Sequence, residues 1–573
     1  MKQFKRISIL MTAMVVAAGI TTAKGAQIEK PAVLQEALLS LTISDFHGML
    51  DGLGSTASQV SPMMNATTLK SLLGMQLGDP ELAGIAAGKG LAVVALDPKT
   101  IFGVIELSAA QLAPYTNKLA ATGMQSHYTK GLLVVGKTAA AVQKGIAAAP
   151  RVRATLLAHR TPTLRIAMQP AGYITANSEK IDGMMQMMPA MMGQSMQAQA
   201  KAQGQSPEAM QGITRLLEGE LRVLLSIMKQ VQAMEITLAP GGGSLRIDKV
   251  LEPVAGSRLA ALVSAPRQNQ WNPKIQSGAA GSAAFMLDFL IENSDALSAF
   301  VAAETASLVS QMKLEGAEVK RISEYMQKCM GICGGTVSES IFGGTTPGLS
   351  LDYIMEVSDE KAALALLRNM QAELKATGFM DLYADMGMPM SFEFKENTRQ
   401  YKGVGIHRLT TKISMEQMPE MQRQQFEAMN LSNMKYEVAI LDGIMAYTMG
   451  DTRMESVIDG IRNPKAGIAP LRARTVFPAG GFYYGDIDMG RYMEFVSSFM
   501  PAMPATPMPL EMISKLLKGA EPITSAGHKS GGLVQWSMNM PADLLARIGQ
   551  AAMAIQMQKM QQMNAPAPVT TQP

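Results

Sequence analysis

One stretch of the chain matches the pattern of a phosphate-binding loop. Gly131-Leu-Leu-Val-Val-Gly136-Lys137-Thr138 has the glycine, the four-residue spacer and the Gly-Lys-Thr of such a loop. That function needs a loop whose backbone N–H groups surround phosphate, whereas Leu-Leu-Val-Val has the composition of a strand. A second copy of the pattern carries Asp451 in place of Lys137, and a carboxylate repels phosphate. We therefore predict a strand here and no nucleotide partner.

Residue patterns typical of hydrolases and metal sites are weak. Ser-x-x-Lys, which can place a lysine beside a nucleophilic serine, recurs at near-chance frequency without Ser-Asp-Asn or Lys-Thr-Gly. These pairs are Ser226/Lys229, Ser310/Lys313 and Ser358/Lys361. The histidines are His47, His127, His159, His407 and His528. They lack the i,i+4 spacing of a metal site, and we interpret each as a surface or loop residue. Distant residues can still assemble a triad in space, so an envelope hydrolase is one alternative function.

Cys329 and Cys333 are the only cysteines, four residues apart. On a helix they share one face. In an oxidising compartment this spacing favours a disulfide that would cap the helix before Gly334-Gly335. Its small loop would stabilise the fold only modestly. Free structural thiols and a redox or metal role are the alternatives, and the spacing differs from the thioredoxin type.

Methionine is unusually frequent, with 49 residues against 15 Phe, 12 Tyr and 2 Trp. Thioether ligands favour Cu(I), so Cu(I) binding is a second alternative function. Met553, Met557, Met560 and Met563 recur at helical spacing, which we interpret as an amphipathic face packed against the protein. A third alternative is a carrier whose adaptable Met-lined groove holds an apolar ligand or lipid. Its candidate binding face is Met184, Met188, Met191 and Met192.

Residues 1–25 have the features of a secretory signal peptide. Lys2, Lys5 and Arg6 precede an uncharged run from Ile7 to Ile20, and Ala23-Lys24-Gly25 fits a small-x-small cleavage site. The run is 14 residues long, short of the roughly 20 that span a bilayer. We therefore expect export to the periplasm or the extracellular space, with an uncleaved anchor as the alternative. We expect no transmembrane span after signal removal.

Removal of this signal makes the protein electrically neutral. The full chain has 51 basic and 47 acidic residues, and loss of the four basic residues in the signal leaves 47 of each. Nucleic-acid binding needs a clustered basic footprint, so this balance argues against a nucleic-acid partner.

Two stretches repeat the same features in the same order. Strand-like runs at 131–135 and 443–449 precede helices that end near Gly145 and Gly460. Aromatic strands are expected next, at 171–174 and 481–484, and then Met-Pro-Ala-Met at 188–191 and 500–503. Agreement in order and spacing predicts an internal duplication.

We predict an α+β fold of two tandem, duplicated domains, each a mainly antiparallel sheet with helices packed on one face. The expected domains are 30–265 and 283–560, joined by a linker at 266–282 that is rich in Asn, Pro, Gly and Ser, and followed by a disordered tail at 565–573. Further strands are expected at 91–96, 103–107 and 351–357. A hairpin at 390–395 and 401–413, turning at 396–398, is an insertion in the second copy.

These patterns favour an exported, non-enzymatic protein of binding or scaffold type. No motif identifies a family of known chemistry, so we assign no catalytic residue, no cofactor and no metal ligand. The expected partner is another protein or an apolar ligand.

Overall fold

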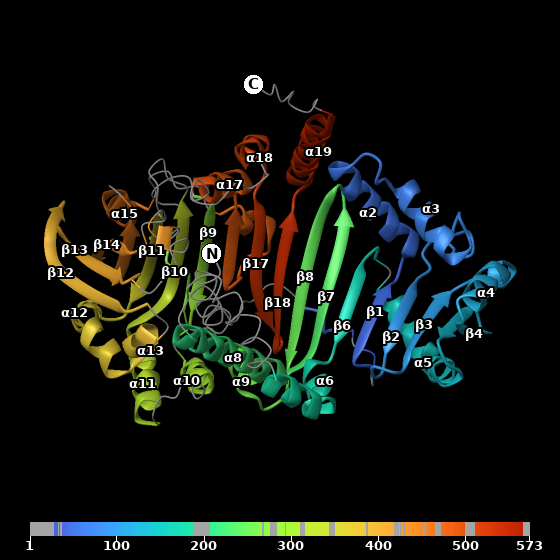
Figure 1. Cartoon of the computed structure of the whole chain (residues 1–573), viewed down its shortest axis with the longest axis horizontal. Helices are drawn as coiled ribbons and strands as arrows, with labels where there is room; N and C mark the ends of the chain where they lie inside the picture. Colours follow the sequence, from blue (N-terminus) through green and yellow to red (C-terminus); the bar gives the residue numbers. More distant parts are fainter. Residues whose placement is uncertain are drawn as a thin grey trace, which may run out of the picture.

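The computed structural model describes residues 28–32, 34, 37–159, 161–187, 207–265, 269–275, 283–292, 294–309, 316–342, 350–385, 388–416, 423–424, 427, 431–450, 453–464, 471–498 and 510–564. Eighteen strands in this part of the chain form one antiparallel sheet that carries helices (Figure 1). The predicted mixed α+β class with mainly antiparallel pairing is confirmed. The expected signal peptide, the Met-Pro-Ala-Met repeats and the tail lie outside the described residues.

The first half of the chain contributes eight strands. Across the sheet their order is β4-β5-β3-β2-β1-β6-β7-β8. The strands are β1 (Leu39–Ile43), β2 (Leu91–Ala95), β3 (Ile101–Glu106), β4 (Gln125–Thr129), β5 (Leu132–Gly136), β6 (Leu164–Met168), β7 (Val231–Gly241) and β8 (Ser244–Pro253).

The second half contributes ten strands in the order β12-β13-β14-β15-β11-β10-β9-β16-β17-β18. The strands are β9 (Phe285–Ile291), β10 (Cys333–Phe342), β11 (Ser350–Val357), β12 (Met390–Tyr401), β13 (Val404–Ile413), β14 (Asn433–Leu441), β15 (Ile444–Met449), β16 (Tyr483–Ile487), β17 (Ile523–Ser530) and β18 (Leu533–Met540). Apart from the outermost pair, β12 and β13, the strands of both halves follow the same order from outer edge to centre.

The two halves meet where β8 pairs with β18. Asp248 lies directly opposite Ser537, and each lies five residues beyond a Gly-Gly turn, at 242–243 and 531–532. The Ser537 hydroxyl donates a hydrogen bond to the Asp248 carboxylate. The sheet is therefore continuous across both halves and does not itself divide the chain into two domains.

Helices of the first half lie on both faces of the sheet, because the outer strands are apolar on both sides. On β3, Phe102 and Val104 pack with Val152 of the helix α5, whereas the alternate residue Ile105 packs in the cluster of Leu50 from α2. The prediction of helices on one face only is therefore wrong. The helices are α2 (Phe46–Val60), α3 (Ala66–Leu77), α4 (Leu112–Ala121), α5 (Ala139–Ala158), α6 (Pro170–Ala176), α8 (Pro207–Lys229) and α9 (Arg258–Ser264).

The second half repeats this two-sided packing. On β11, Ile354 packs with Ile458 of α15, whereas its neighbour Met355 packs with Leu366 of α12. The helices are α10 (Asp295–Val309), α11 (Gly316–Ile332), α12 (Glu360–Ala376), α13 (Phe379–Asp385), α15 (Arg453–Arg462), α16 (Ala473–Val476), α17 (Met489–Ser498), α18 (Leu510–Leu517) and α19 (Ala542–Asn564). No helix in the described ranges is long and apolar enough to cross a membrane.

The expected strands at 91–96, 103–107, 131–135, 351–357 and 443–449 are all present, with small shifts at their ends. The expected strand at 171–174 is wrong, because this stretch forms α6. Pro170 stands at the first turn of that helix, where its missing N–H costs nothing, and the strand lies earlier, at β6.

Helix α5 does not end near Gly145 but continues to Ala158. This glycine serves close packing: a Cβ there would lie 2.5 Å from Val134 Cγ1 and 2.9 Å from the Phe102 ring. The inserted hairpin is confirmed, but its turn is Lys402-Gly403. Residues 396–398 instead lie within β12, where the register shifts between Lys395 and Arg399.

The middle of the expected linker packs against the second half. The Trp271 indole N–H donates to Gly481 O at 3.2 Å, and the Asn272 amide donates to Thr336 Oγ1 at 2.6 Å. Ile275 is buried in the cluster under α15. These contacts fix residues 269–275 in place.

Candidate functional site

The P-loop-like pattern forms a hairpin strand. Gly131 lies in the turn between β4 and β5, and the residues from Leu132 to Gly136 are all buried in β5. Thr138 then caps α5 by accepting a hydrogen bond from the Ala141 amide at 3.2 Å. The backbone N–H groups of the spacer belong to a strand ladder, as its composition indicated.

Two of the five histidines are neither surface nor loop residues. His407 and His528 are buried in β13 and β17, and the interpretation as surface or loop residues is wrong for both. His407 Nδ1 accepts from the Asn397 amide at 3.2 Å, and His528 Nε2 lies 3.0 Å from Pro478 O. Burial lowers the pKa of each imidazole. Each imidazole therefore has a backbone partner in the folded chain.

The other chemical motifs remain scattered. Ser226 and Lys229 lie on α8, and the Ser358 hydroxyl donates to Gly331 O at 3.0 Å. Ser310 and Lys313 lie outside the described residues. Across the described ranges, no three His, Cys, Asp or Glu side chains come together as a metal site.

Cys329 lies near the end of α11, and Cys333 is the first residue of β10. Both are free thiols in this structure, so the disulfide stays a prediction about the oxidised protein. Burial raises the pKa of both, that of Cys333 to about 12. Such thiols react slowly, because the thiolate is the nucleophile.

Methionine is found both in the core and on the surface. Met184 is 57% exposed on the helix that ends at residue 187, whereas Met188, Met191 and Met192 lie outside the described residues. On α19, Met557 is 60% exposed, and Met553 is also exposed. The expectation that this face packs against the protein is therefore wrong for these two residues. The core-facing residues of α19 include Leu544 and Ala551 instead.

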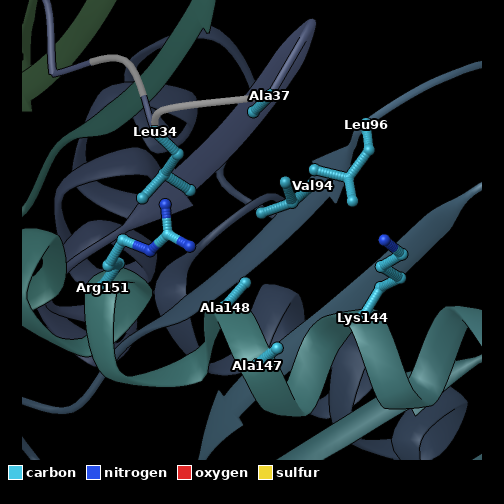
Figure 2. A pocket seen from close by; sticks show the side chains of 8 residues that line it. All are labelled: Leu34, Ala37, Val94, Leu96, Lys144, Ala147, Ala148 and Arg151. Atoms are coloured by element: carbon cyan, nitrogen blue, oxygen red, sulfur yellow. The ribbon is translucent and has the colours of Figure 1, made fainter.

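A pocket lies where α5 meets β2 and the segment before β1 (Figure 2). Its volume is about 110 Å³, and it is open to solvent on one side. Aliphatic side chains form one wall, and α5 forms the other with two cations and two alanines. The lining residues are Leu34, Ala37, Val94, Leu96, Lys144, Ala147, Ala148 and Arg151.

The helical repeat places the two cations. Lys144 and Arg151 are seven residues apart, so both lie on one face of α5, with Ala147 and Ala148 between them. Figure 2 shows the small alanines leaving a gap between the two long side chains, opposite Leu34 and Val94. The two positive charges therefore lie across the pocket from its aliphatic wall.

Both cations are exposed, and neither forms a salt bridge within the described part of the chain. The local sequence explains this, because residues 107–178 contain eight Lys and Arg but no Asp or Glu. An anion that enters the pocket therefore meets no competing carboxylate from this stretch. Arg151 can hold a carboxylate or phosphate by two parallel hydrogen bonds, and Lys144 adds a point charge.

Sequence reasoning did not single out Lys144 or Arg151. The available signal was the long run without acidic residues, whereas Leu34 and Val94 are distant in sequence and only the fold brings them to α5. Comparison of the chain with protein-family models, with curated proteins and with solved structures finds no match.

Proposed function

We propose that this protein is an exported, non-enzymatic binding protein whose pocket takes a small anion with a short apolar chain. The observation that carries the proposal is that Lys144 and Arg151 lie on one face of α5, opposite the aliphatic wall that includes Leu34 and Val94. Neither cation has an acidic partner in the described part of the chain. A carboxylate or phosphate group matches the two cations, and an aliphatic chain matches the wall.

The size of the pocket indicates modest affinity. Burial of about three methylene groups stabilises the complex by roughly 2.5 kcal/mol. Two exposed ion pairs add about 0.5 kcal/mol each. The sum, about 3.5 kcal/mol before ordering costs, corresponds to a dissociation constant of a few millimolar.

Calorimetric titration with octanoate tests the proposal, with acetate and hexanol as ligands that lack the chain or the charge. We expect octanoate to bind more tightly than either. Lys144→Gln and Arg151→Gln should each weaken octanoate binding, whereas Lys137→Gln should not, because Lys137 is exposed in the same acid-free stretch but does not line the pocket. Equal losses in all three variants would mean general charge attraction and would contradict the proposal.

Export is the second part of the proposal and is supported by the charged and apolar pattern of residues 1–25. N-terminal sequencing of protein recovered from the cell envelope or medium tests it. A chain that begins at Ala26 agrees with cleavage after Gly25, and one that begins at Lys24 agrees with cleavage after Ala23 instead. A chain that keeps Met1 contradicts the cleaved signal.

We also infer that the two halves are copies of one ancestral unit. The shared strand order supports this, and so does the direct pairing of Asp248 with Ser537, which occupy the same position after their Gly-Gly turns. Two copies related by a twofold axis through this pair would produce such a register. An experimental structure in which β1–β8 did not superpose on their counterparts in the second half would contradict the inference.

A further inference from the structure

We propose that the outer edge of β4 accepts an extended, acidic segment of a partner protein as an additional antiparallel strand. This site is separate from the pocket on α5. The argument uses the hydrogen-bonding pattern of β4, the corresponding edge of the second half, and the charge around β4.

The turn after β4 fixes which backbone groups point outward. Lys130 and Gly131 have φ values of 48° and 82°, the conformation of a two-residue type I′ hairpin turn. Thr129 and Leu132, which flank it, therefore form a hydrogen-bonded pair, and the pattern alternates along the strand. The N–H and C=O groups of Ser126 and Tyr128 consequently face away from β5. No described strand pairs with them, and β4 ends the sheet (Figure 1).

The second half fills the corresponding position with its own chain. Strand β14 stands beside β15 as β4 stands beside β5, and its turn, Asp442-Gly443, has matching φ values of 51° and 72°. The outer edge of β14 pairs antiparallel with β13, from Ile406 opposite Ala439 to Lys412 opposite Asn433. In the first half the chain passes from β3 to β4 through α4 and a short 3-10 turn, with no such hairpin. An added antiparallel strand therefore fits this edge.

The two edge strands of the sheet differ in how well they are protected against pairing with another chain. Natural edge strands avoid association through charged residues, proline or bulges. The opposite edge, β12, carries Glu393, Lys395 and Glu396 and a register shift before Arg399. Strand β4, Gln-Ser-His-Tyr-Thr, has no Lys, Glu or Pro and no register shift, and its first three residues are exposed. The β4 edge can therefore pair with another strand, whereas the charges and the register shift of β12 hinder such pairing.

Charge selects the occupant. Helices α4 and α5 both pack against β4, and both lie in the stretch 107–178 that has no acidic residue. Lys118, Lys130 and Lys137 of this stretch form no salt bridge within the described chain. A second copy would bring two such edges together and like charges would repel, whereas an acidic segment would be attracted.

The test measures binding of labelled peptides by fluorescence anisotropy at about 0.15 M salt, where distant charges are screened. The probe is a decapeptide of alternating glutamate and valine. One control replaces each valine with proline, which keeps the charge but removes strand pairing, and a second replaces each glutamate with lysine. We expect only the glutamate–valine peptide to bind.

Ser126→Pro removes one outward N–H without touching the bonds to β5, and Ser126→Ala is its matched control. We expect proline to weaken binding about tenfold and alanine to leave it unchanged. Equal binding of the proline-containing peptide, or unchanged binding by Ser126→Pro, would overturn the proposal. Should Ser126→Pro fail to fold, amide hydrogen exchange of the wild-type protein tests the proposal instead. The Ser126 and Tyr128 amides should exchange more slowly when the peptide is bound, and unchanged exchange would refute the added strand.

Discussion

Replacement of Arg474 by methionine should destabilise the centre of the sheet. The Arg474 guanidinium donates to Asp288 Oδ2 at 2.8 Å, and the Asp288 side chain is only 3% exposed. The same guanidinium stacks 4.1 Å from the Trp271 ring centroid and 4.8 Å from that of Tyr484. It thus joins the segment after α9, strand β9 and strand β16. Methionine keeps most of the aliphatic packing but removes the guanidinium, and with it the charge, the hydrogen bond and both ring contacts.

The expected loss follows from these contacts. A hydrogen bond to a charged group contributes about 1.5–3 kcal/mol. Two cation–π contacts add about 0.5 kcal/mol each, since Arg474 is partly exposed. We therefore expect the free energy of unfolding to fall by about 3 kcal/mol, within the range seen when one partner of a buried ion pair is removed.

Urea unfolding followed by circular dichroism measures this loss. Arg472→Met is the matched control, because its salt bridge with Glu521 has side chains 46% and 44% exposed and should contribute less than about 1 kcal/mol. In the double variant Arg474→Met/Asp288→Asn, the removal of the buried charge should recover part of the loss. A loss for Arg474→Met no greater than for Arg472→Met would refute the reasoning.

Three further predictions concern packing, pH and thiols. Gly145→Ala should cost about 1–3 kcal/mol in urea unfolding, because its Cβ would meet a buried valine at 2.5 Å. Gly183→Ala, on a helix with open space around it, should be neutral or stabilising, and the reverse order would contradict the packing argument. Burial lowers the pKa of Lys529 to about 8, so between about pH 8 and 10 the unfolded chain binds more protons and stability should rise with pH by up to about 3 kcal/mol. Lys529→Met should lack this rise. If stability rose equally with pH in the variant and the wild-type protein, Lys529 would not be its origin. Cys329 and Cys333 should resist alkylation at pH 8 when folded and react rapidly in urea after reduction. Lack of reaction in unfolded, unreduced protein would reveal the predicted disulfide, whereas rapid reaction in the folded state would contradict burial.

Local pattern predicted much of the secondary structure. Apolar runs bounded by glycine turns identified β5 and β15, because the apolar pattern of a strand and the residue types of its turns lie close together in the sequence. The errors occurred where one residue type serves two purposes. The sequence pattern predicted the end of a helix near Gly145, whereas this glycine in fact permits close packing of α5 on Val134. Exposed Met557 has the same spacing as a buried face, because periodicity reports a face and not what covers it.

The sequence by itself determined the α+β class, the positions of most strands and the acid-free stretch 107–178, within which Lys144 and Arg151 form no salt bridge in the described part of the chain. Only the tertiary structure decided that β8 pairs with β18 to make one sheet, that β4 stays at an open edge, and that Leu34 and Val94 complete the pocket on α5. The physical reason is the sequence separation of the contacts involved. Turns and periodicity are encoded within a few residues, whereas strand order and pockets depend on contacts between segments far apart in the chain.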